Sequence, residues 1–248
     1  MMGGGSWATA LAKLLLENCE MIDWYMRRDD RIEDFKRLRH NPAYLTDVHF
    51  DVQRIEFSSD INKVCAECDT LLMVMPSPYF KDHLAKLTVD ISNKYIVSAV
   101  KGIVPDENEI ISDYMVNYYG VDQRHMLVVS GPCHAEEVAL NVPTGLLAAC
   151  QNQEMAELVQ DAFMADTLRV YTSSDPVGAE LGAALKNVIA LCAGITDGLN
   201  CGDNTKAMLM TRGLTETARL GVALGARKET FTGLAGVGDL IVTCTSMH

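Results

Sequence analysis

The chain has 248 residues and an apolar fraction of 48%, which suits one large or two modest globular domains with a sizeable core. Its formal net charge of −12 argues against binding to nucleic acid, which requires a basic face, so an anionic substrate would need a local cluster of Lys, Arg or backbone N–H groups. The sequence contains neither an uninterrupted apolar run of about eighteen residues nor a signal-peptide pattern, so we expect a cytoplasmic protein without a membrane span.

The eight cysteines have no spacing typical of a disulfide framework. Cys65 and Cys68 form the only C-x-x-C pair, and a single pair lacks the second set of ligands that a structural zinc needs. We therefore predict reduced, mostly structural thiols and no metal site.

Short β-rich segments alternate with helical patterns up to Pro176. The predicted strands are Met21–Met26, Thr70–Met75, Tyr95–Val100, Met126–Ser130, Gly145–Cys150 and Leu168–Thr172. The helices predicted between them are Trp7–Glu17, Arg31–Leu38, Tyr79–Val89, Glu107–Tyr119 and Met155–Met164. This alternation is typical of an α/β domain with a largely parallel sheet and helices on both faces.

The pattern becomes helical after Pro176. Two long segments rich in Ala, Leu and Gly predict helices over Val177–Ile195 and Thr205–Leu224, with Asp203 or Asn204 as the N-cap of the second. We place a domain boundary here, so that residues 1–176 form the α/β domain and residues 177–248 form an all-α domain.

A glycine-rich motif lies at the start of the chain. The segment Gly3–Ala8 fits the pattern G-x-G-x-x-A of Rossmann dinucleotide-binding folds, and an amphipathic helix follows it. Glycines let the backbone approach a pyrophosphate, which the free N–H groups of the helix can bind. A strand should precede the motif, and because only Met1 and Met2 do, we expect the first strand to be missing. A flexible or tag-derived terminus is the alternative.

The end of the following strand should contact the ribose of the cofactor. Asp23 is the nearest acidic residue, but it is predicted to lie in mid-strand. Arg27 and Arg28 fall at the strand end, where they could contact a 2′-phosphate. Solvated surface arginines are an equally good interpretation, so the choice between NAD and NADP stays open.

Three further segments follow predicted strands: Val74–Tyr79, Val100–Gly102 and Ser130–Ala135. Because ligands bind beyond the carboxyl ends of strands in open α/β sheets, we predict a shared cleft that includes the ammonium of Lys101. An ordinary Lys-Gly turn is the alternative. Cys133 and His134 are adjacent in sequence, and adjacent residues seldom place their side chains within hydrogen-bond reach. The pair therefore does not predict a thiolate nucleophile with a histidine base.

Leu181–Gly198 predicts a buried apolar helix that is interrupted by Lys186 and Asn187. Desolvation lowers the pKa of a lysine toward neutrality, which makes Lys186 the first candidate for acid–base chemistry. Further along, Asp239 and Thr243 lie four residues apart, so on a helix they would share a face and could converge on one ligand. Asp239 could also be a helix N-cap.

Taken in order along the chain, these segments resemble the bacterial-type NAD(P)-dependent glycerol-3-phosphate dehydrogenases. The matching segments are Gly3–Leu11, Asn41–Leu45, Val100–Ile103, Gly131–Val138, Leu181–Gly198, Gly202–Ala207, Thr211–Glu216 and Gly233–Ser246. The resemblance implies a Rossmann-like domain followed by an all-α substrate domain. It also implies reversible reduction of dihydroxyacetone phosphate to sn-glycerol 3-phosphate by NADH or NADPH, for glycerophospholipid synthesis.

The resemblance implies roles for individual residues as well, with Lys186 as the general acid/base. The implied substrate-binding residues are Lys101, Gly131, Cys133, Asn187, Asp239 and Thr243. The implied cofactor-binding residues are Gly3, Gly5, Ser6, Trp7, Arg27, Arg28, Tyr44, Tyr79, Lys101 and Ala135. The oligomeric state is left open, with a homodimer as the candidate.

The chain departs from the family pattern in several places. Cys133 stands where Ser or Asn is usual, and Ala8 stands where Gly is usual. The family continues past the position of His248 with a Ser-Arg-Asn segment that grips the substrate phosphate, so we expect a truncated enzyme. Two alternatives therefore stay open: a dinucleotide-binding fragment with impaired catalysis, and a related dehydrogenase of 2-hydroxy acids.

Overall fold

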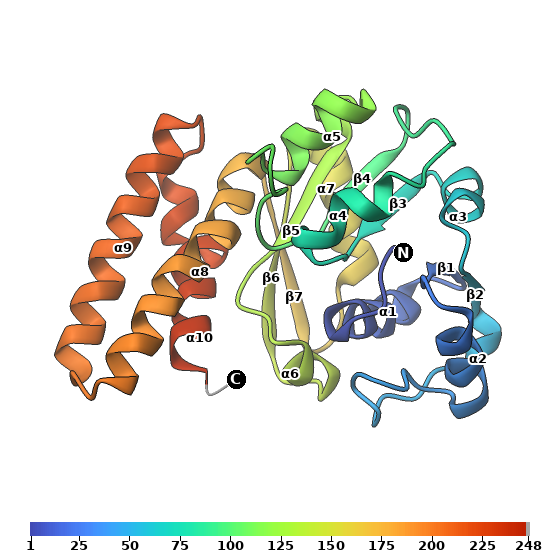
Figure 1. Ribbon diagram of the computed structural model, residues 1–248, viewed down its shortest axis with the longest axis horizontal. Helices are drawn as coiled ribbons and strands as arrows, with labels where there is room; N and C mark the ends of the chain where they lie inside the picture. Colours follow the sequence, from blue (N-terminus) through green and yellow to red (C-terminus); the bar gives the residue numbers. More distant parts are fainter. Residues whose placement is uncertain (247–248) are drawn as a thin grey trace.

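A twisted sheet with helices on both faces forms one part of the protein, and three helices stand beside it (Figure 1). The computed structural model describes residues 1–246. The strands are β1 (Ile22–Tyr25), β2 (Ile55–Ser58), β3 (Thr70–Met73), β4 (Tyr95–Ser98), β5 (Met126–Ser130), β6 (Thr144–Cys150) and β7 (Leu168–Ser173). Every predicted strand is confirmed to within about two residues at either end, as expected for pattern-based boundaries.

The strand order is β1-β2 in one part and β3-β4-β5-β6-β7 in the other, and Met2 joins the two by parallel bridges to Tyr25 and Met73. The backbone N–H of Met2 donates to Leu72 O over 2.8 Å. The strand that was expected to be missing is therefore represented by Met1 and Met2, which hold its place between β1 and β3.

The sheet is parallel throughout except between β5 and β6. This confirms the prediction of a largely parallel sheet. β6 runs against β5 because the connection between them, through the short helix α6 (Ala135–Ala139), returns the chain along the neighbouring strand. Such a return needs no crossover over the sheet face.

β2 and the helix α3 (Ile61–Glu67) have no counterpart among the predicted elements. In β2 only Ile55 and Phe57 are buried, so the alternation is too short to stand out in the sequence. The predicted helix Glu107–Tyr119 begins later than expected, at Ile111, because Asn108 has φ +57°, which lies outside the helical region.

Helices cover both faces of the sheet, as predicted. One face packs against α1 (Ser6–Asn18), α2 (Asp29–Leu38), α6 and α7 (Gln153–Phe163). The other packs against α3, α4 (Ser77–Leu84) and α5 (Ile111–Tyr119). Neighbouring residues of a strand point to opposite faces of the sheet. Trp24 therefore packs into the hydrophobic core on the first face and Tyr25 into the core on the second. This is the doubly wound arrangement of a Rossmann-like sheet.

The helical part consists of α8 (Pro176–Gly198), α9 (Asp203–Ala223) and α10 (Asp239–Thr245), with a 3₁₀ turn over Lys228–Thr232 and a π-helical turn over Leu234–Gly238 before α10. The predicted N-cap of α9 was wrong by one or two residues. Gly202 occupies that position with φ +81°, a conformation that favours glycine, and Asp203 is the first helical residue.

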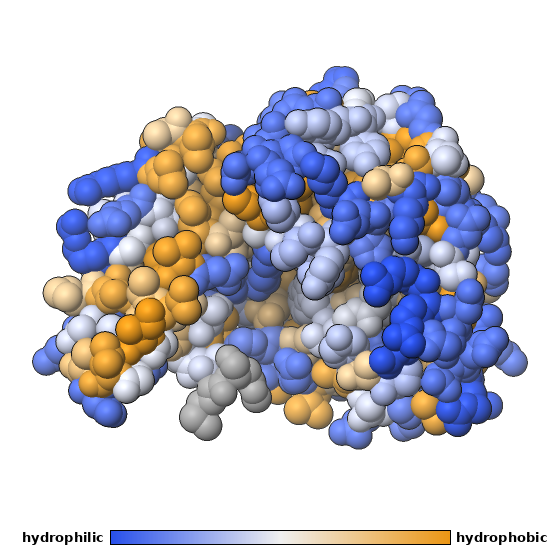
Figure 2. All heavy atoms as spheres, viewed as in Figure 1, coloured by the Kyte–Doolittle hydropathy of each residue, from blue (hydrophilic) through white to orange (hydrophobic). Residues whose placement is uncertain are grey.

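The prediction of a buried helix holds for one side of α8 only. Val188, Leu191 and Ile195 are exposed, and Figure 2 shows apolar side chains gathered over this helical part of the surface. By length and composition alone α8 could cross a membrane, but half of its most apolar stretch is buried within the protein. That stretch carries Lys186, and its buried side packs against α9, α10 and β5, which is the environment of a core helix.

A buried carboxyl group links α8 to the sheet part. Glu180 Oε2 accepts hydrogen bonds from the backbone N–H and the hydroxyl of Ser112, at the start of α5. Burial raises the pKa of Glu180 to about 7, while the Ser112 hydrogen bonds oppose the rise and Asp113 adds to it. The folded protein therefore holds a proton on Glu180 at pH values where the unfolded chain has released it.

This proton predicts a pH-dependent stability that Glu180→Gln removes. Because the folded pKa lies above the ordinary value of 4.5, the free energy of unfolding should fall as the pH rises from 4.5 to about 7. The full loss is about 3 kcal/mol. Urea unfolding of the wild type and Glu180→Gln at the two ends of this range measures it, with the exposed Glu216→Gln as control. Equal pH slopes in wild type and Glu180→Gln would contradict the prediction.

Candidate active site

A cleft of about 820 Å³ opens at the carboxyl ends of β1, β3, β4 and β5. Every residue predicted to bind the cofactor lines it: Gly3, Gly5, Ser6, Trp7, Arg27, Arg28, Tyr44, Tyr79, Lys101 and Ala135. The parallel strands bring these segments together because their carboxyl ends meet at one edge of the sheet. The volume lies within the range of small-molecule and cofactor pockets.

The backbone of the glycine loop needs glycine at its first position. Gly3 has φ +127°, and a Cβ there would lie 2.8 Å from Val74 O, so no other residue fits. Gly5 precedes α1 without a side-chain cap, and a Cβ on it would meet nothing within 4 Å. The first residues of α1 line the cleft without a side-chain cap, and helix geometry and dipole favour an anion at such an N-terminus.

Arginines follow β1 in the cleft. Arg27 and Arg28 both line it, together with Arg31 of α2. Arg28 forms an exposed ion pair with Asp30, which leaves its guanidinium near the surface. Asp23 lies in mid-strand in β1, as predicted from the sequence.

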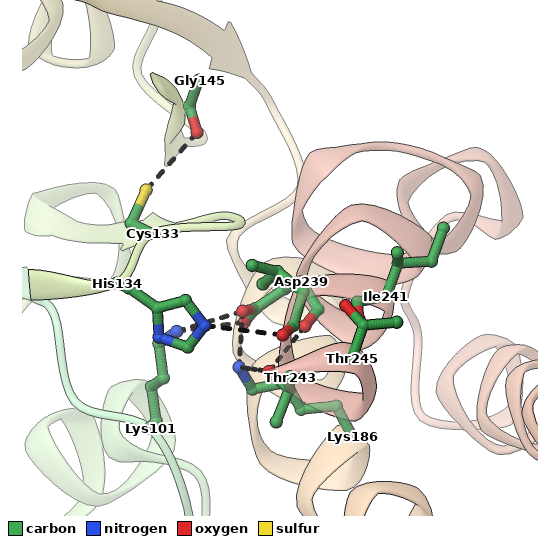
Figure 3. A network of polar contacts seen from close by, with 10 residues as sticks. Lys101, Cys133, His134, Gly145, Lys186, Asp239, Ile241, Thr243 and Thr245 are labelled. Carbon is green, nitrogen blue, oxygen red and sulfur yellow. Dashed lines mark hydrogen bonds and ion pairs between the residues drawn. The ribbon is translucent and has the colours of Figure 1, made fainter. Parts of the chain in front are cut away.

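Two ammonium groups share one buried carboxylate beyond the end of the cleft (Figure 3). Asp239 is fully buried, and its Oδ1 lies 3.1 Å from Lys101 Nζ and 2.5 Å from Lys186 Nζ. Lys186 Nζ also donates to Thr243 Oγ1 over 2.8 Å. Asp239 and Thr243 thus converge from one face of α10, which confirms the predicted geometry, although Gly238 rather than Asp239 is the N-cap.

A close backbone approach places Asp239 beside Lys186. Gly182 lies one helical turn before Lys186 on α8, and a Cβ on it would lie 2.3 Å from Ala235 O. The π-helical turn that contains Ala235 can therefore reach α8 only because position 182 is glycine. This contact fixes the start of α10 against the lysine.

The lysine cluster has an unusual acid–base character. Burial, and then the neighbouring ammonium of Lys101, lower the pKa of Lys186 to about 8, while Asp239 opposes the shift. The direction is the one predicted from the apolar sequence around Lys186. A lysine with such a pKa can donate a proton as the ammonium and accept one as the free amine near neutral pH.

The remaining predicted substrate residues are Gly131, Cys133 and Asn187. Gly131 turns the chain after β5 with φ +142°, and Cys133 lines the cleft while its thiol donates to Gly145 O. Burial raises the pKa of Cys133 to about 12, so its thiol stays protonated. Asn187 is exposed, because consecutive helical residues point about 100° apart and Lys186 takes the inward position.

Two residues without a predicted role lie in the cleft wall. His134 lines the cleft and its Nε2 is 3.4 Å from Val242 O in α10, so it contacts the same helix as the lysine cluster. Asn41 lines the cleft from beneath the glycine loop and is 1% exposed. The sequence singled out Asn41 only through the segment Asn41–Leu45, which resembles the family but was given no role for this residue, and through the Asn-Pro pair, which marks a turn.

Cysteine clusters do not add a metal centre in the described part of the chain. Cys65 and Cys68 are free, and burial raises the pKa of both thiols. Within residues 1–246, no three His, Cys, Asp or Glu side chains gather in a way that could hold a metal ion.

Comparison with known proteins connects this site to a family. The family models of the N-terminus and C-terminus of NAD-dependent glycerol-3-phosphate dehydrogenase match residues 1–156 and 175–248. The glycerol-3-phosphate dehydrogenases [NAD(P)+] of Lysinibacillus sphaericus and Bacillus subtilis are each 44% identical over the whole chain, which covers 74% and 72% of their lengths.

A solved structure agrees with the sequence matches. The crystal structure of glycerol-3-phosphate dehydrogenase from Coxiella burnetii superposes with a TM-score of 0.89 at 32% identity, covering 99% of this chain and 75% of the other. The Rossmann-like sheet domain and the helical part that follows it thus match one enzyme family. The chain belongs to the NAD(P)-dependent glycerol-3-phosphate dehydrogenases.

Proposed function

We propose that this enzyme reversibly reduces dihydroxyacetone phosphate to sn-glycerol 3-phosphate, with Lys186 as the general acid/base. The observation that carries the proposal is the buried Lys186 ammonium, held by Asp239 and Thr243 next to a dinucleotide-sized cleft. The activity is that named for the relatives at 44% identity. The product would serve glycerophospholipid synthesis in the cytoplasm.

The cleft residues fit NAD or NADP. The N-terminus of α1 and the Gly3–Gly5 loop would hold the pyrophosphate, and Arg27 and Arg28 would contact the adenosine ribose or its 2′-phosphate. When bound, the reduced nicotinamide supplies a hydride to the carbonyl carbon of the substrate. The residues of the helical part would then orient the substrate from the opposite side.

Lys186 handles the proton in this proposal. Its Nζ donates a proton to the carbonyl oxygen as negative charge develops there, and takes it back in the reverse reaction. Asp239 and Thr243 hold Nζ in place through two hydrogen bonds. Lys101, which is partly exposed, supplies a second positive charge for a phosphorylated substrate in a protein of strongly negative net charge.

The division of labour follows the fold. We propose that residues 1–176 bind the cofactor and residues 177–248 complete the substrate site, since β7 ends at Ser173 and α8 begins at Pro176. Residues 247 and 248 lie outside the described part of the chain. Asn187, Gly131 and Cys133 remain predicted substrate residues, and a homodimer remains a predicted assembly.

Oxidation of NADH and NADPH by the purified chain tests the proposal. Turnover with dihydroxyacetone phosphate, and much less with a 2-keto acid at the same concentration, is the expected result. Turnover with the 2-keto acid alone would favour the related 2-hydroxy-acid dehydrogenase. Cofactor binding by calorimetry with no turnover on either substrate would favour a dinucleotide-binding fragment.

The pKa of Lys186 predicts opposite pH limbs for the two directions. Reduction needs the ammonium, so its kcat/KM should fall as the pH rises through about 8, whereas oxidation needs the free amine, so its kcat/KM should rise over the same range. Initial rates in both directions between about pH 6 and pH 10 measure this. Parallel limbs in the two directions would assign the titration to another group.

A further inference from the structure

We infer that Asn41 is a positioning residue that holds the glycine loop in its pyrophosphate-binding conformation. The inference rests on the proposed cofactor site and adds to it a residue that does not itself contact the chemistry. It starts from the placement of an amide group, 1% exposed, directly beneath the loop.

Both the nitrogen and the oxygen of the Asn41 side-chain amide form hydrogen bonds. Its Nδ2 donates to Gly4 O over 3.1 Å and to Thr9 Oγ1 over 2.8 Å, and its Oδ1 accepts from Ala43 N over 3.0 Å. Thr9 is fully buried, and its hydroxyl passes the chain of hydrogen bonds on to Gly5 O over 2.9 Å. The carbonyls of two consecutive loop residues are therefore fixed from one buried side.

Fixing these carbonyls orients the N–H groups. In a trans peptide the carbonyl and the following N–H point in opposite directions. Because Gly4 O accepts from buried Asn41, the N–H of Gly5 points away from Asn41, and both Gly4 and Gly5 line the cleft. Glycines hold such a conformation poorly by themselves, since they have the greatest backbone freedom. The Asn41–Thr9 network thus supplies the rigidity that the sequence of the loop lacks.

The same amide fixes a second wall of the cleft. The Ala43 N–H to Asn41 Oδ1 bond closes a turn immediately before Tyr44, and both Ala43 and Tyr44 line the cleft. Substitution of Asn41 should therefore weaken the grip on the pyrophosphate first. It should leave groups that bind through Arg27 and Arg28 largely unaffected.

Asn41→Asp tests the inference, because it keeps the shape and replaces the donor by an oxygen that faces two acceptors. We expect the Kd of ADP-ribose, which contains the pyrophosphate, to rise by about tenfold or more, and that of adenosine 2′-phosphate by less than about threefold. With the whole enzyme, the KM for NADH or NADPH should rise while the kcat at saturating cofactor stays within about threefold.

Asn62→Asp is the matched control. Asn62 also uses both ends of its amide, donating to Lys86 O and accepting from Thr88 N, but it lies outside the residues that line the cleft. Thr9→Val removes the shared hydroxyl without adding a charge, and provides the test if Asn41→Asp does not fold. Thr9→Val should also raise the Kd of ADP-ribose and leave the Kd of adenosine 2′-phosphate nearly unchanged.

The outcomes separate the inference from the function on which it rests. The positioning role is supported if Asn41→Asp or Thr9→Val selectively weakens the binding of ADP-ribose while Asn62→Asp binds both probes like the wild type. Equal weakening of both probes, or no weakening, overturns it while the cofactor site stands. Failure of the wild type to bind ADP-ribose, NADH and NADPH would overturn the proposed cofactor site itself.

Discussion

Lys186→Met is expected to lower the kcat for reduction of dihydroxyacetone phosphate about a thousandfold, with the Kd of NADH changed less than about threefold. Methionine fills nearly the same volume but supplies no proton, and the alkoxide that develops on the substrate oxygen would be left without a donor. Because Lys186 lies beyond the cofactor cradle, its loss should act on chemistry rather than on cofactor binding. Steady-state rates and calorimetric titration with NADH measure the two effects separately.

Lys206→Met provides the control for this variant. Lys206 belongs to the same helical part and also forms an ion pair, with Asp197 over 2.7 Å, but that pair lies at the surface of the α8–α9 end. Its kcat should stay close to that of the wild type. A Lys186→Met enzyme with wild-type turnover would remove Lys186 from the proposed mechanism.

Asp239→Asn should have the second large effect, on stability and on the acid–base behaviour of Lys186 together. The substitution leaves the ammonium groups of Lys101 and Lys186 facing each other without the buried carboxylate between them. Breaking a buried pair in this way costs about 3 kcal/mol or more in the free energy of unfolding. The pKa of Lys186, already lowered by burial and by Lys101, should fall further.

The loss of stability in Asp239→Asn should depend on pH. In Asp239→Asn the free amine forms at a lower pH than in the wild type and relieves the repulsion, so the destabilisation should shrink as the pH rises toward about 8 and stay constant above it. Denaturant unfolding at pH values on both sides of the pKa measures it. Asp197→Asn is the matched control, since its carboxylate is more than half exposed and exposed pairs contribute less than about 1 kcal/mol. Equal stability losses in the two variants would contradict the buried-pair assignment.

The sheet and most of the helices could be predicted because their residues carry local patterns. Met126–Ser130 is a run of apolar and β-branched residues, and it is the strand β5 with the same bounds. β2 was missed because its alternation extends over two buried residues only. The exposed side of α8 was not predicted because an apolar sequence does not show which neighbours cover it. Hydrophobic periodicity shows which residues prefer burial, and packing decides whether they obtain it.

That the predicted cofactor residues line one cleft was predictable for a similar reason. The signals are local in the sequence. They are glycines in a fixed pattern before a helix and polar residues after strands, and both indicate a ligand site at the carboxyl edge of the sheet. Asn41 was part of a family-matching segment but received no role, because its hydrogen bonds run to Gly4 and Thr9, which lie 37 and 32 residues away in the chain. A residue that acts through distant partners leaves no local pattern.

By itself, the sequence determined the α/β architecture, the glycine cradle and the presence of one lysine in an apolar helix. Only the tertiary structure decided that this lysine shares a carboxylate with Lys101, since Asp239 lies 53 residues from Lys186 and 138 from Lys101. The physical reason is that local patterns depend on backbone geometry over a few residues, whereas the pKa of Lys186 depends on charges brought within about 3 Å by folding.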